Sequence, residues 1–267
     1  MPTSATTTTP RNPLPGCPGP AAGPCCARRS GFIQAVRPDP LVEACAEHGL
    51  FFLLGVRPGD HVTQGAPIGS VWTADGAPAA DAGTLAGAVA QAVEVGFERT
   101  LEHDAALGLR QLTDIAVKAI SPSVNDPITA AHAIGYCADL LARLQHRELG
   151  PQQHLDDHGV PRLVTPDRDH RYYLDLVCAP IRRFGAGEPL VLTALLRMLR
   201  ACAADARDDT QRTEISRQSQ LILRTMDTGL IDSDAEEVRD FAHRVELALA
   251  GNLDDAFRDR AGETRSV

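Results

Sequence analysis

Residues 50–72 read LFFLLGVRPGDHVTQGAPIGSVW. An apolar run opens this stretch, and Arg57-Pro58-Gly59-Asp60 follows it as a turn signal, with Pro preset for the second position and Gly for the third. Between His61 and Trp72, apolar residues are separated by Gly and Pro, which is typical of short strands and not of a helix. Together with the apolar stretch at 32–36, this pattern predicts a compact β module over residues 30–75.

The sequence after this module changes to a helical pattern. It becomes rich in alanine, and apolar residues recur with a period of about 3.6. The predicted helices span residues 82–97, 104–120, 126–146, 169–184, 189–206, 209–229 and 233–250, and a short helix at 40–48 falls inside the β module. Residues 147–168 are polar and contain proline, so they are predicted to be a loop. We therefore expect an α+β fold, in which a small barrel-sandwich-like β module is followed by a larger all-α helical bundle over residues 76–251.

The composition of the two ends predicts tails. Residues 1–29 are dominated by Thr, Pro, Gly and Ala and are expected to be a disordered low-complexity tail, and residues 252–267 are expected to be flexible. The formal net charge is -9, the pI is near 5.4, and no Lys/Arg cluster is present, so nucleic acid is not an expected partner. The longest apolar run, residues 50–54, is far shorter than the ~20 residues of a membrane-spanning helix.

Seven cysteines are scattered without any CxxC pair, which favours a reducing compartment. Cys17, Cys25 and Cys26 lie in the Pro/Gly-rich tail, which offers no rigid scaffold for a metal. His154 and His158 are four residues apart, but the Gly and Pro that follow predict a solvated loop. We therefore expect no metal site and no cofactor.

A dense group of polar residues lies between 98 and 127. Arg110, Asp114 and Lys118 recur every four residues, so a helix would place them along one face. A proline at 122 ends that helix, and Asn125 or Asp126 can then cap the next one. The ordinary interpretation is an ion-pair ladder, a helix stop and an N-cap.

The alternative interpretation of this segment is a ligand-binding or enzymatic site for a small anion or a metal. Arg110 and the helix start after Asn125 would face each other across a cleft and hold an anion, with Asp104 and Asp114 orienting Arg110. The same region could instead bind a cation through Asp104, Asp114 and Asp126. The candidate ligand-binding residues are Asp104, Arg110, Gln111, Asp114, Asn125 and Asp126.

The stretch GLRQLTDIA at 108–116, followed by AISP at 119–122 and NDP at 125–127, resembles the bacterial family catalogued as domain of unknown function 2254, predicted membrane proteins. The segments SGFIQ at 30–34 and RPGDHV at 57–62 match it too, and the likeness covers about residues 30–230. The resemblance implies a domain attached to a multi-helix membrane anchor, and it brings no established activity.

The resemblance implies N-terminal membrane helices, and we expect them to be missing from this sequence, which a truncated gene, a misplaced start codon or a real soluble variant would each explain. Membrane association would come through that absent anchor, and the chain as given is expected to be soluble and cytoplasmic. The β module also resembles half of a biotinyl or lipoyl-type barrel-sandwich, but no lysine stands in its turn. We expect a non-enzymatic scaffold, sensing or interaction domain. Apolar helix faces in excess of what one small bundle needs also predict a homo-oligomer.

Overall fold

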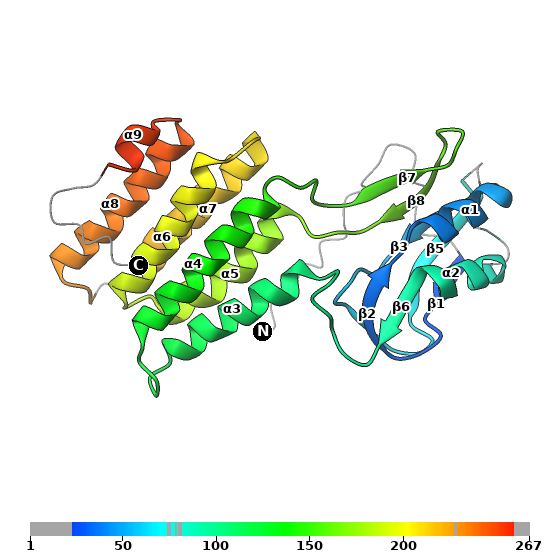
Figure 1. Cartoon of the computed structure of the whole chain (residues 1–267), viewed down its shortest axis with the longest axis horizontal. Helices are drawn as coiled ribbons and strands as arrows, with labels where there is room; N and C mark the ends of the chain where they lie inside the picture. The colour runs from blue at the N-terminus through cyan, green and yellow to red at the C-terminus, as the bar shows by residue number, and fades with distance from the viewer. Residues whose placement is uncertain (1–22, 74–75, 78, 80–81, 227–228, 259–267) are drawn as a thin grey trace, which may run out of the picture. The chain divides into compact units, whose positions relative to one another are not determined.

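The computed structural model describes residues 23–73, 76–77, 79, 82–226 and 229–258 of the 267-residue chain (Figure 1). These residues separate into two compact units. The sheet unit takes the residues up to His103 and then Pro151–Asp167, whereas the helical unit takes Asp104–Gly150 and the residues from Arg168 onward. The α+β class predicted from the sequence is confirmed.

The sheet unit contains two small sheets. The five-stranded sheet has the order β1 (Gly23–Cys26), β5 (Pro67–Thr73), β3 (Leu50–Leu54), β8 (Pro161–Thr165) and β7 (Gln152–Leu155). The three-stranded sheet has the order β4 (His61–Val62), β2 (Gly31–Val36) and β6 (Val93–Gly96). The helices of this unit are α1 (Asp39–Glu47), the 3₁₀ turn η1 (Ala82–Leu85) and α2 (Ala86–Ala92). The described strand pairs are antiparallel, apart from the parallel pair of β3 and β8.

Alternating side chains build the core of the sheet unit. Along β2 and β3 every second residue is buried, as expected when one face of a strand packs inward. Ile33, Phe52 and Leu54 are at most 1% exposed, and Leu41 of α1 and Leu163 of β8 are fully buried in the same cluster. Burying each such side chain stabilises the fold by roughly 1.5–3 kcal/mol.

The prediction of a loop at residues 147–168 is wrong, because this segment contains the β7–β8 hairpin. Strand β8 joins the sheet next to β3, with Leu163 opposite Phe52 and Val164 opposite Leu53. The segment is short and partly polar, so its own pattern gives no strand signal. Its partner strand lies about a hundred residues earlier in the chain, and only that pairing makes it a strand.

Two further strands were not predicted. The helix expected at 82–97 ends at Ala92, and Val93–Gly96 forms β6, whose alternating buried valines pair with β2. The tail expected to be disordered at 1–29 contains β1, which pairs with β5 and buries Cys25. Residues 1–22 of that tail lie outside the described residues.

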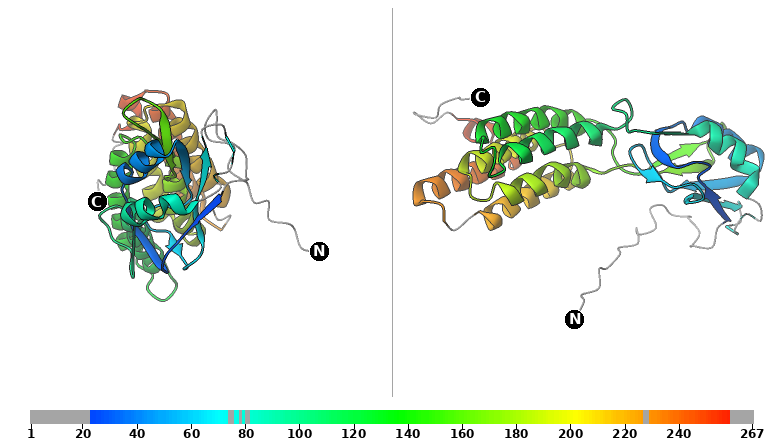
Figure 2. Two further views of the ribbon diagram at one scale, coloured as in Figure 1. Left: turned by 90° about the vertical axis from the view of Figure 1, so that its right-hand side faces the viewer. Right: turned by 90° about the horizontal axis from the view of Figure 1, so that it is seen from below.

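The helical unit consists of helices packed side by side, and the β7–β8 hairpin of the sheet unit separates α4 from α5 along the chain. Its elements are α3 (Ala105–Ala119), α4 (Pro127–Leu144), α5 (His170–Phe184), α6 (Pro189–Ala204), α7 (Asp209–Thr225), α8 (Asp232–Leu249) and α9 (Leu253–Ala256). Figure 2 shows α3 to α8 lying side by side. The helices predicted from residue 104 onward are confirmed to within a few residues. The short helix α9 falls in the tail that was expected to be flexible, and residues 259–267 lie outside the described ranges.

Aspartate side chains begin several of these helices. Asp104, Asp126, Asp169 and Asp208 each accept a hydrogen bond from the backbone amide three residues further on. The first amides of a helix have no partner inside it, so each carboxylate satisfies one of them and also interacts favourably with the positive end of the helix dipole. These caps fix where the helices start.

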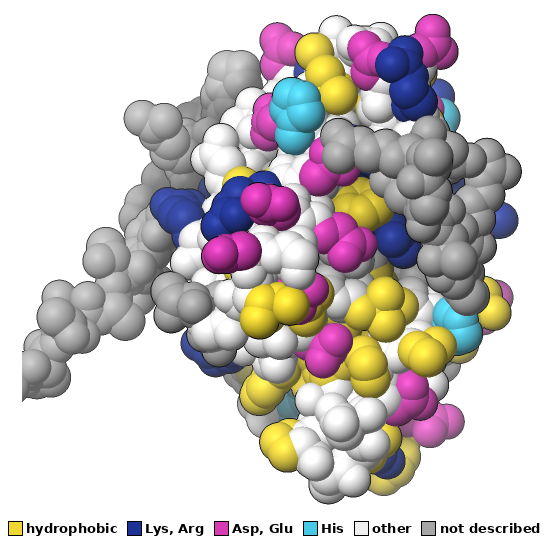
Figure 3. All heavy atoms as spheres, turned by 90° about the vertical axis from the view of Figure 1, so that its left-hand side faces the viewer, with side chains coloured by type: hydrophobic (Ala, Val, Ile, Leu, Met, Phe, Trp, Pro, Cys, Tyr) yellow, Lys and Arg dark blue, Asp and Glu magenta, His cyan; other side chains and the backbone are white. Residues whose placement is uncertain are grey.

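One end of the helical unit carries apolar side chains at its helix connections. Val124 lies between α3 and α4, Phe184 ends α5, and Ile231 precedes α8, and each is at least half exposed. Figure 3 shows this end, where hydrophobic side chains lie among carboxylates. These three side chains lie at helix connections, and the excess of apolar helix faces expected from the sequence stays a prediction.

Replacing Gly69 by alanine is expected to destabilise the sheet unit. A Cβ at this position would lie 2.5 Å from Phe52 Cζ and 2.8 Å from the backbone oxygen of Leu53, so the strand must shift, at a cost of about 1–3 kcal/mol. The measurement is urea unfolding followed by fluorescence of Trp72, which is the single tryptophan and lies buried in β5.

The matched control is Gly87→Ala in α2, where an added Cβ meets no atom within 4 Å. This change is expected to stabilise the same transition by up to about 1 kcal/mol, because alanine favours a helix. Equal shifts of the same sign for both variants would contradict the packing described around Gly69.

Candidate functional site

The structure places the residues of the predicted ligand site in different environments. Asp104 is 2% exposed at the start of α3, where Oδ1 accepts a hydrogen bond from Leu107 N at 3.3 Å and lies 3.7 Å from a guanidinium nitrogen of Arg168. Arg110 and Asp114 are exposed further along α3. Asp104 thus serves as a helix cap and as the partner of a buried arginine.

Asn125 and Asp126 form the break between α3 and α4. Asn125 adopts a left-handed backbone with φ of 51°, which asparagine tolerates better than most residues. Asp126 caps α4 by accepting a hydrogen bond from Thr129 N at 3.0 Å. The hydroxyl and the backbone amide of Thr129 hold the pKa of Asp126 below its usual range. Of the two capping candidates, the structure therefore selects Asp126.

These residues are spread along α3 and its end. About 13 Å of helix rise separates Arg110 from the last residue of α3, and Asn125 lies beyond that end. The side chains of Arg110, Gln111, Asp114 and Asn125 are all exposed. Ligand binding through them stays a prediction, whereas the ordinary interpretation already accounts for Asp104 and Asp126.

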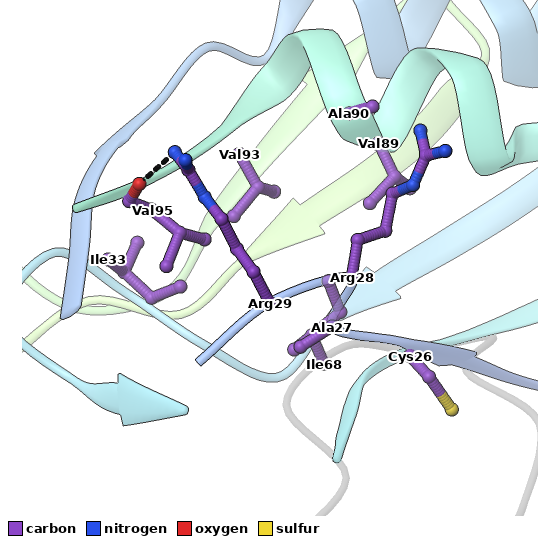
Figure 4. A pocket seen from close by; sticks show the side chains of 10 residues that line it. All are labelled: Cys26, Ala27, Arg28, Arg29, Ile33, Ile68, Val89, Ala90, Val93 and Val95. Atoms are coloured by element: carbon purple, nitrogen blue, oxygen red, sulfur yellow. Dashed lines mark hydrogen bonds between the residues drawn. The ribbon is translucent and has the colours of Figure 1, made fainter. Parts of the chain in front are cut away.

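A pocket of about 270 Å³ lies in the sheet unit, among β2, β5, β6, α2 and the turn after β1 (Figure 4). It is called here the arginine-flanked pocket. Its lining is apolar apart from the two arginines and one thiol, and consists of Cys26, Ala27, Arg28, Arg29, Ile33, Ile68, Val89, Ala90, Val93 and Val95. The apolar walls are held rigidly, because Ile33, Ile68, Val89, Val93 and Val95 belong to the core of this unit.

Backbone hydrogen bonds hold the turn that carries the two arginines. Ala27 N donates to Ala66 O and Gly65 N donates to Ala27 O, both at 2.8 Å. Gln64 N also donates to Ser30 Oγ at 2.9 Å. These hydrogen bonds join the turn after β1 to the turn before β5, so the backbone of Arg28 and Arg29 is held in place.

The two guanidinium groups lie on opposite sides of the pocket. In Figure 4, Arg29 extends toward β6, where it donates to the backbone oxygen of Val95, and Arg28 extends toward Val89 and Ala90 of α2. Within the described residues, Arg28 makes no hydrogen bond or ion pair. An exposed, unpaired guanidinium beside an apolar cavity is able to receive an anion.

Sequence reasoning missed this pocket. Its lining comes from three stretches of the chain, 26–33, 68 and 89–95, and apart from the two arginines its residue types are those of an ordinary core. The pair Arg28-Arg29 was assigned to the disordered tail. The available signal was the adjacent arginines directly before the first predicted strand.

A second, more polar pocket of the sheet unit lies between α1 and the β7–β8 hairpin, with Asp39, Glu43 and Asp157 in its lining. His154 also lines it, but it belongs to β7 and not to a solvated loop as predicted, and its Nε2 lies 2.9 Å from Thr165 Oγ1. Burial lowers the pKa of His154. In the part of the chain that the structure describes, no three His, Cys, Asp or Glu side chains converge as metal ligands would.

The helical unit buries a histidine at the start of α5. His170 is 5% exposed, and neither ring nitrogen has a hydrogen-bond partner within the described residues. Burial lowers the pKa of His170, although Asp208, Glu214 and Asp169 act in the opposite direction. The imidazole is therefore held in its neutral form at neutral pH.

Glu214, one of the carboxylates that act on His170, belongs to a network of ion pairs between α5 and α7. Arg217 bridges the two helices, with an N–O distance of 2.8 Å to Asp175, and it also pairs with Glu214. Gln218 donates to the same Asp175 oxygen at 2.6 Å. Because these contacts join α5 to α7, we interpret them as a network that stabilises the helical unit.

A family described as predicted membrane proteins, domain of unknown function 2254, matches residues 3–201 of the chain. The chain belongs to this family. The resemblance seen in the sequence is therefore confirmed. Among the described helices of this DUF2254 member, none combines the length and the apolarity needed to cross a bilayer.

Similar proteins include uncharacterised proteins of Mycobacterium bovis and Mycobacterium tuberculosis. Each is 36% identical over 218 residues, which cover 82% of this chain and 42% of the relative. The DUF2254 chain thus spans less than half the length of these relatives. No solved structure matches it.

The stability of the helical unit is expected to depend on pH through His170. Its folded pKa is lowered by burial, so the unfolded chain binds the proton more readily. The contribution of the neutral imidazole is complete above the unfolded pKa of about 6.5 and is lost as the pH falls toward the folded pKa. His170→Gln is expected to lose less stability than the unmodified chain between pH 7 and 5, in urea unfolding followed by far-UV circular dichroism.

The control for this measurement is His243→Gln, because His243 is exposed on α8. It is expected to keep the pH dependence of the unmodified chain. If His170→Gln also kept that dependence unchanged, the burial of a neutral His170 would be contradicted.

Proposed function

We propose that this domain is a non-enzymatic sensor, which binds a small ligand with an apolar body and an anionic end in the arginine-flanked pocket. The observation that carries this proposal is the combination, at one place, of an apolar cavity of about 270 Å³ and the guanidinium of Arg28, which has no partner among the described residues. Small-molecule sites are usually apolar clefts with few polar groups that orient the ligand.

The volume of the pocket limits the size of the ligand. A dry apolar cavity of about 150 Å³ binds benzene. By comparison, the pocket of about 270 Å³ suits a chain or ring system of about eight carbons. Arg28 and Arg29 favour a carboxylate or phosphate at the end of such a ligand, because the guanidinium fork matches the geometry of these oxyanions.

The chemistry of the lining favours binding over catalysis. The one thiol among the described lining residues, that of Cys26, has no carboxylate or imidazole in the lining to act as its general base. Elsewhere, burial raises the pKa of Cys45, Cys137 and Cys202 to about 12. Such thiols stay protonated and are poor nucleophiles.

The family supplies the setting for this sensor. The family is described as predicted membrane proteins. In such a protein, binding of an amphipathic anion to this domain would change the conformation of the membrane-bound part. The described cysteines are all free thiols, which supports the cytoplasm or another reducing compartment for this domain.

The proposal predicts that octanoate stabilises the sheet unit against heat, with Trp72 fluorescence as the readout. A ligand at a hundred times its dissociation constant adds about 2.7 kcal/mol. Along the series from butanoate to octanoate, each methylene group is expected to increase the affinity about fourfold, because its burial contributes about 0.8 kcal/mol. Acetate, which lacks the apolar body, is expected to give no shift.

The role of the cation is tested by Arg28→Gln, which is expected to weaken octanoate binding and to leave the weaker binding of octanol unchanged. The matched control is Arg37→Gln, because Arg37 is an exposed arginine of the same unit that lies outside the pocket. No shift with any chain length, or equal binding of octanoate and octylammonium, would contradict the proposed function.

A further inference from the structure

The helical unit has an apolar groove between α4 and α6, separate from the arginine-flanked pocket. Its volume is about 320 Å³. The groove is lined by Ile128, Ala131, His132, Gly135 and Ala138 of α4 and by Leu190, Ala194, Arg197 and Met198 of α6. The two helices pack directly against each other, so the groove follows their contact line.

Small residues of α4 make one wall of this groove. Ala131, Gly135 and Ala138 recur at helical spacing, and a Cβ added at Gly135 would meet no atom within 4 Å. The groove is therefore open at Gly135. Ala194 and Met198, which are 7% and 2% exposed, make the opposite wall and are fixed in the core of the unit.

A large side chain protrudes beside the groove. Tyr136 directly follows Gly135 and is 68% exposed. Successive residues of a helix are about 100° apart around the axis and 1.5 Å apart along it. Tyr136 is thus nearly level with Gly135 of the groove along the axis of α4, but it points about 100° away from it around the helix.

We propose that this face is a homodimer interface, in which Tyr136 of each copy fills the groove of the other. Consider a twofold axis that runs parallel to α4 in front of its exposed face. Rotation about this axis leaves each residue at the same level along the helix and exchanges the left and right sides of the face. Each Tyr136 then lies opposite the groove of the other copy. Such a contact uses the same patch on both copies, as a closed dimer requires.

Size and charge both suit this occupant. A cavity of about 150 Å³ holds a benzene ring, so the groove of about 320 Å³ accepts the side chain of a tyrosine. His132 and Arg197 line the groove, and a cationic or hydrogen-bonding rim suits an aromatic ring and its hydroxyl group. The guanidinium of Arg197 lies 4.7 Å from the ring centre of the buried Phe241, which holds this cation in place at the edge of the groove.

The test is the molar mass of the full chain by light scattering over a range of micromolar concentrations. The unmodified chain is expected to form a dimer. Gly135→Leu fills the groove from within, and Tyr136→Ala removes the protruding ring. Each change is expected to raise the dimer dissociation constant about 30-fold or more, as for a residue central to an interface.

Folding is checked independently of association. The Cβ of Gly135→Leu meets no atom within 4 Å, and the change replaces a helix-disfavouring residue, so the helix content and the unfolding midpoint of the monomer are expected to be kept or raised. Phe184→Ala is the control, because Phe184 is 63% exposed at the end of α5 and lies outside the groove. It is expected to leave the dimer intact.

A monomer at all concentrations would overturn the inference. So would a dimer that survives both groove variants, or one that only one of the two variants dissociates, since the ring and the groove must act together. These outcomes concern the helical unit, and octanoate binding in the sheet unit succeeds or fails independently of them.

Discussion

The parallel pairing of β8 with β3 is the interaction on which the sheet unit depends. The chain completes most of the unit, leaves it to form α3 and α4, and returns with the β7–β8 hairpin. Arg162 of β8 pairs with Asp156 at 2.7 Å and donates to the backbone oxygen of Leu50, 112 positions earlier, at 3.4 Å. Leu163 and Phe52, opposite each other, are completely buried.

The arginine-flanked pocket inherits its geometry from this pairing. Strand β3, held on one side by β8, pairs on its other side with β5, and β5 pairs with β1. The end of β1 carries the turn with Arg28 and Arg29, and β5 contributes Ile68 to the pocket wall. A hairpin from a distant part of the sequence thus supports the sheet that positions the cavity and its cations.

The sequence predicted the helical unit well and the sheet unit only in part. Helices are stabilised by contacts between residues three and four positions apart. Their periodicity can therefore be recognised from a short stretch of sequence. The partners of β1 and β8 are distant in sequence, and a short strand without its partner has no distinct pattern. Val93 and Val95 of β6 do alternate, but the preceding alanines extend the helical period over them.

The same distinction explains which site residues were found. The segment from Asp104 to Asp126 is contiguous and polar, so the sequence alone indicates it as a candidate site. In the structure, this segment supplies the N-caps of α3 and α4. The pocket is assembled from three stretches of the chain, 26–33, 68 and 89–95, and its lining is mostly ordinary apolar residues, so no sequence motif marks it. Its proposed role depends on walls that belong to the core and on a cation without a partner among the described residues, which are properties of the folded chain.

Ligand entry into the arginine-flanked pocket is tested most directly by methyl-resolved NMR during an octanoate titration. The predicted result is saturable chemical-shift changes at the methyl groups of Ile33, Ile68, Val89, Val93 and Val95, which line the pocket, with the methyl groups of the helical unit unchanged. Absence of shifts at these five residues, or shifts centred on Ile128 and Leu190 of the α4–α6 groove, would contradict it.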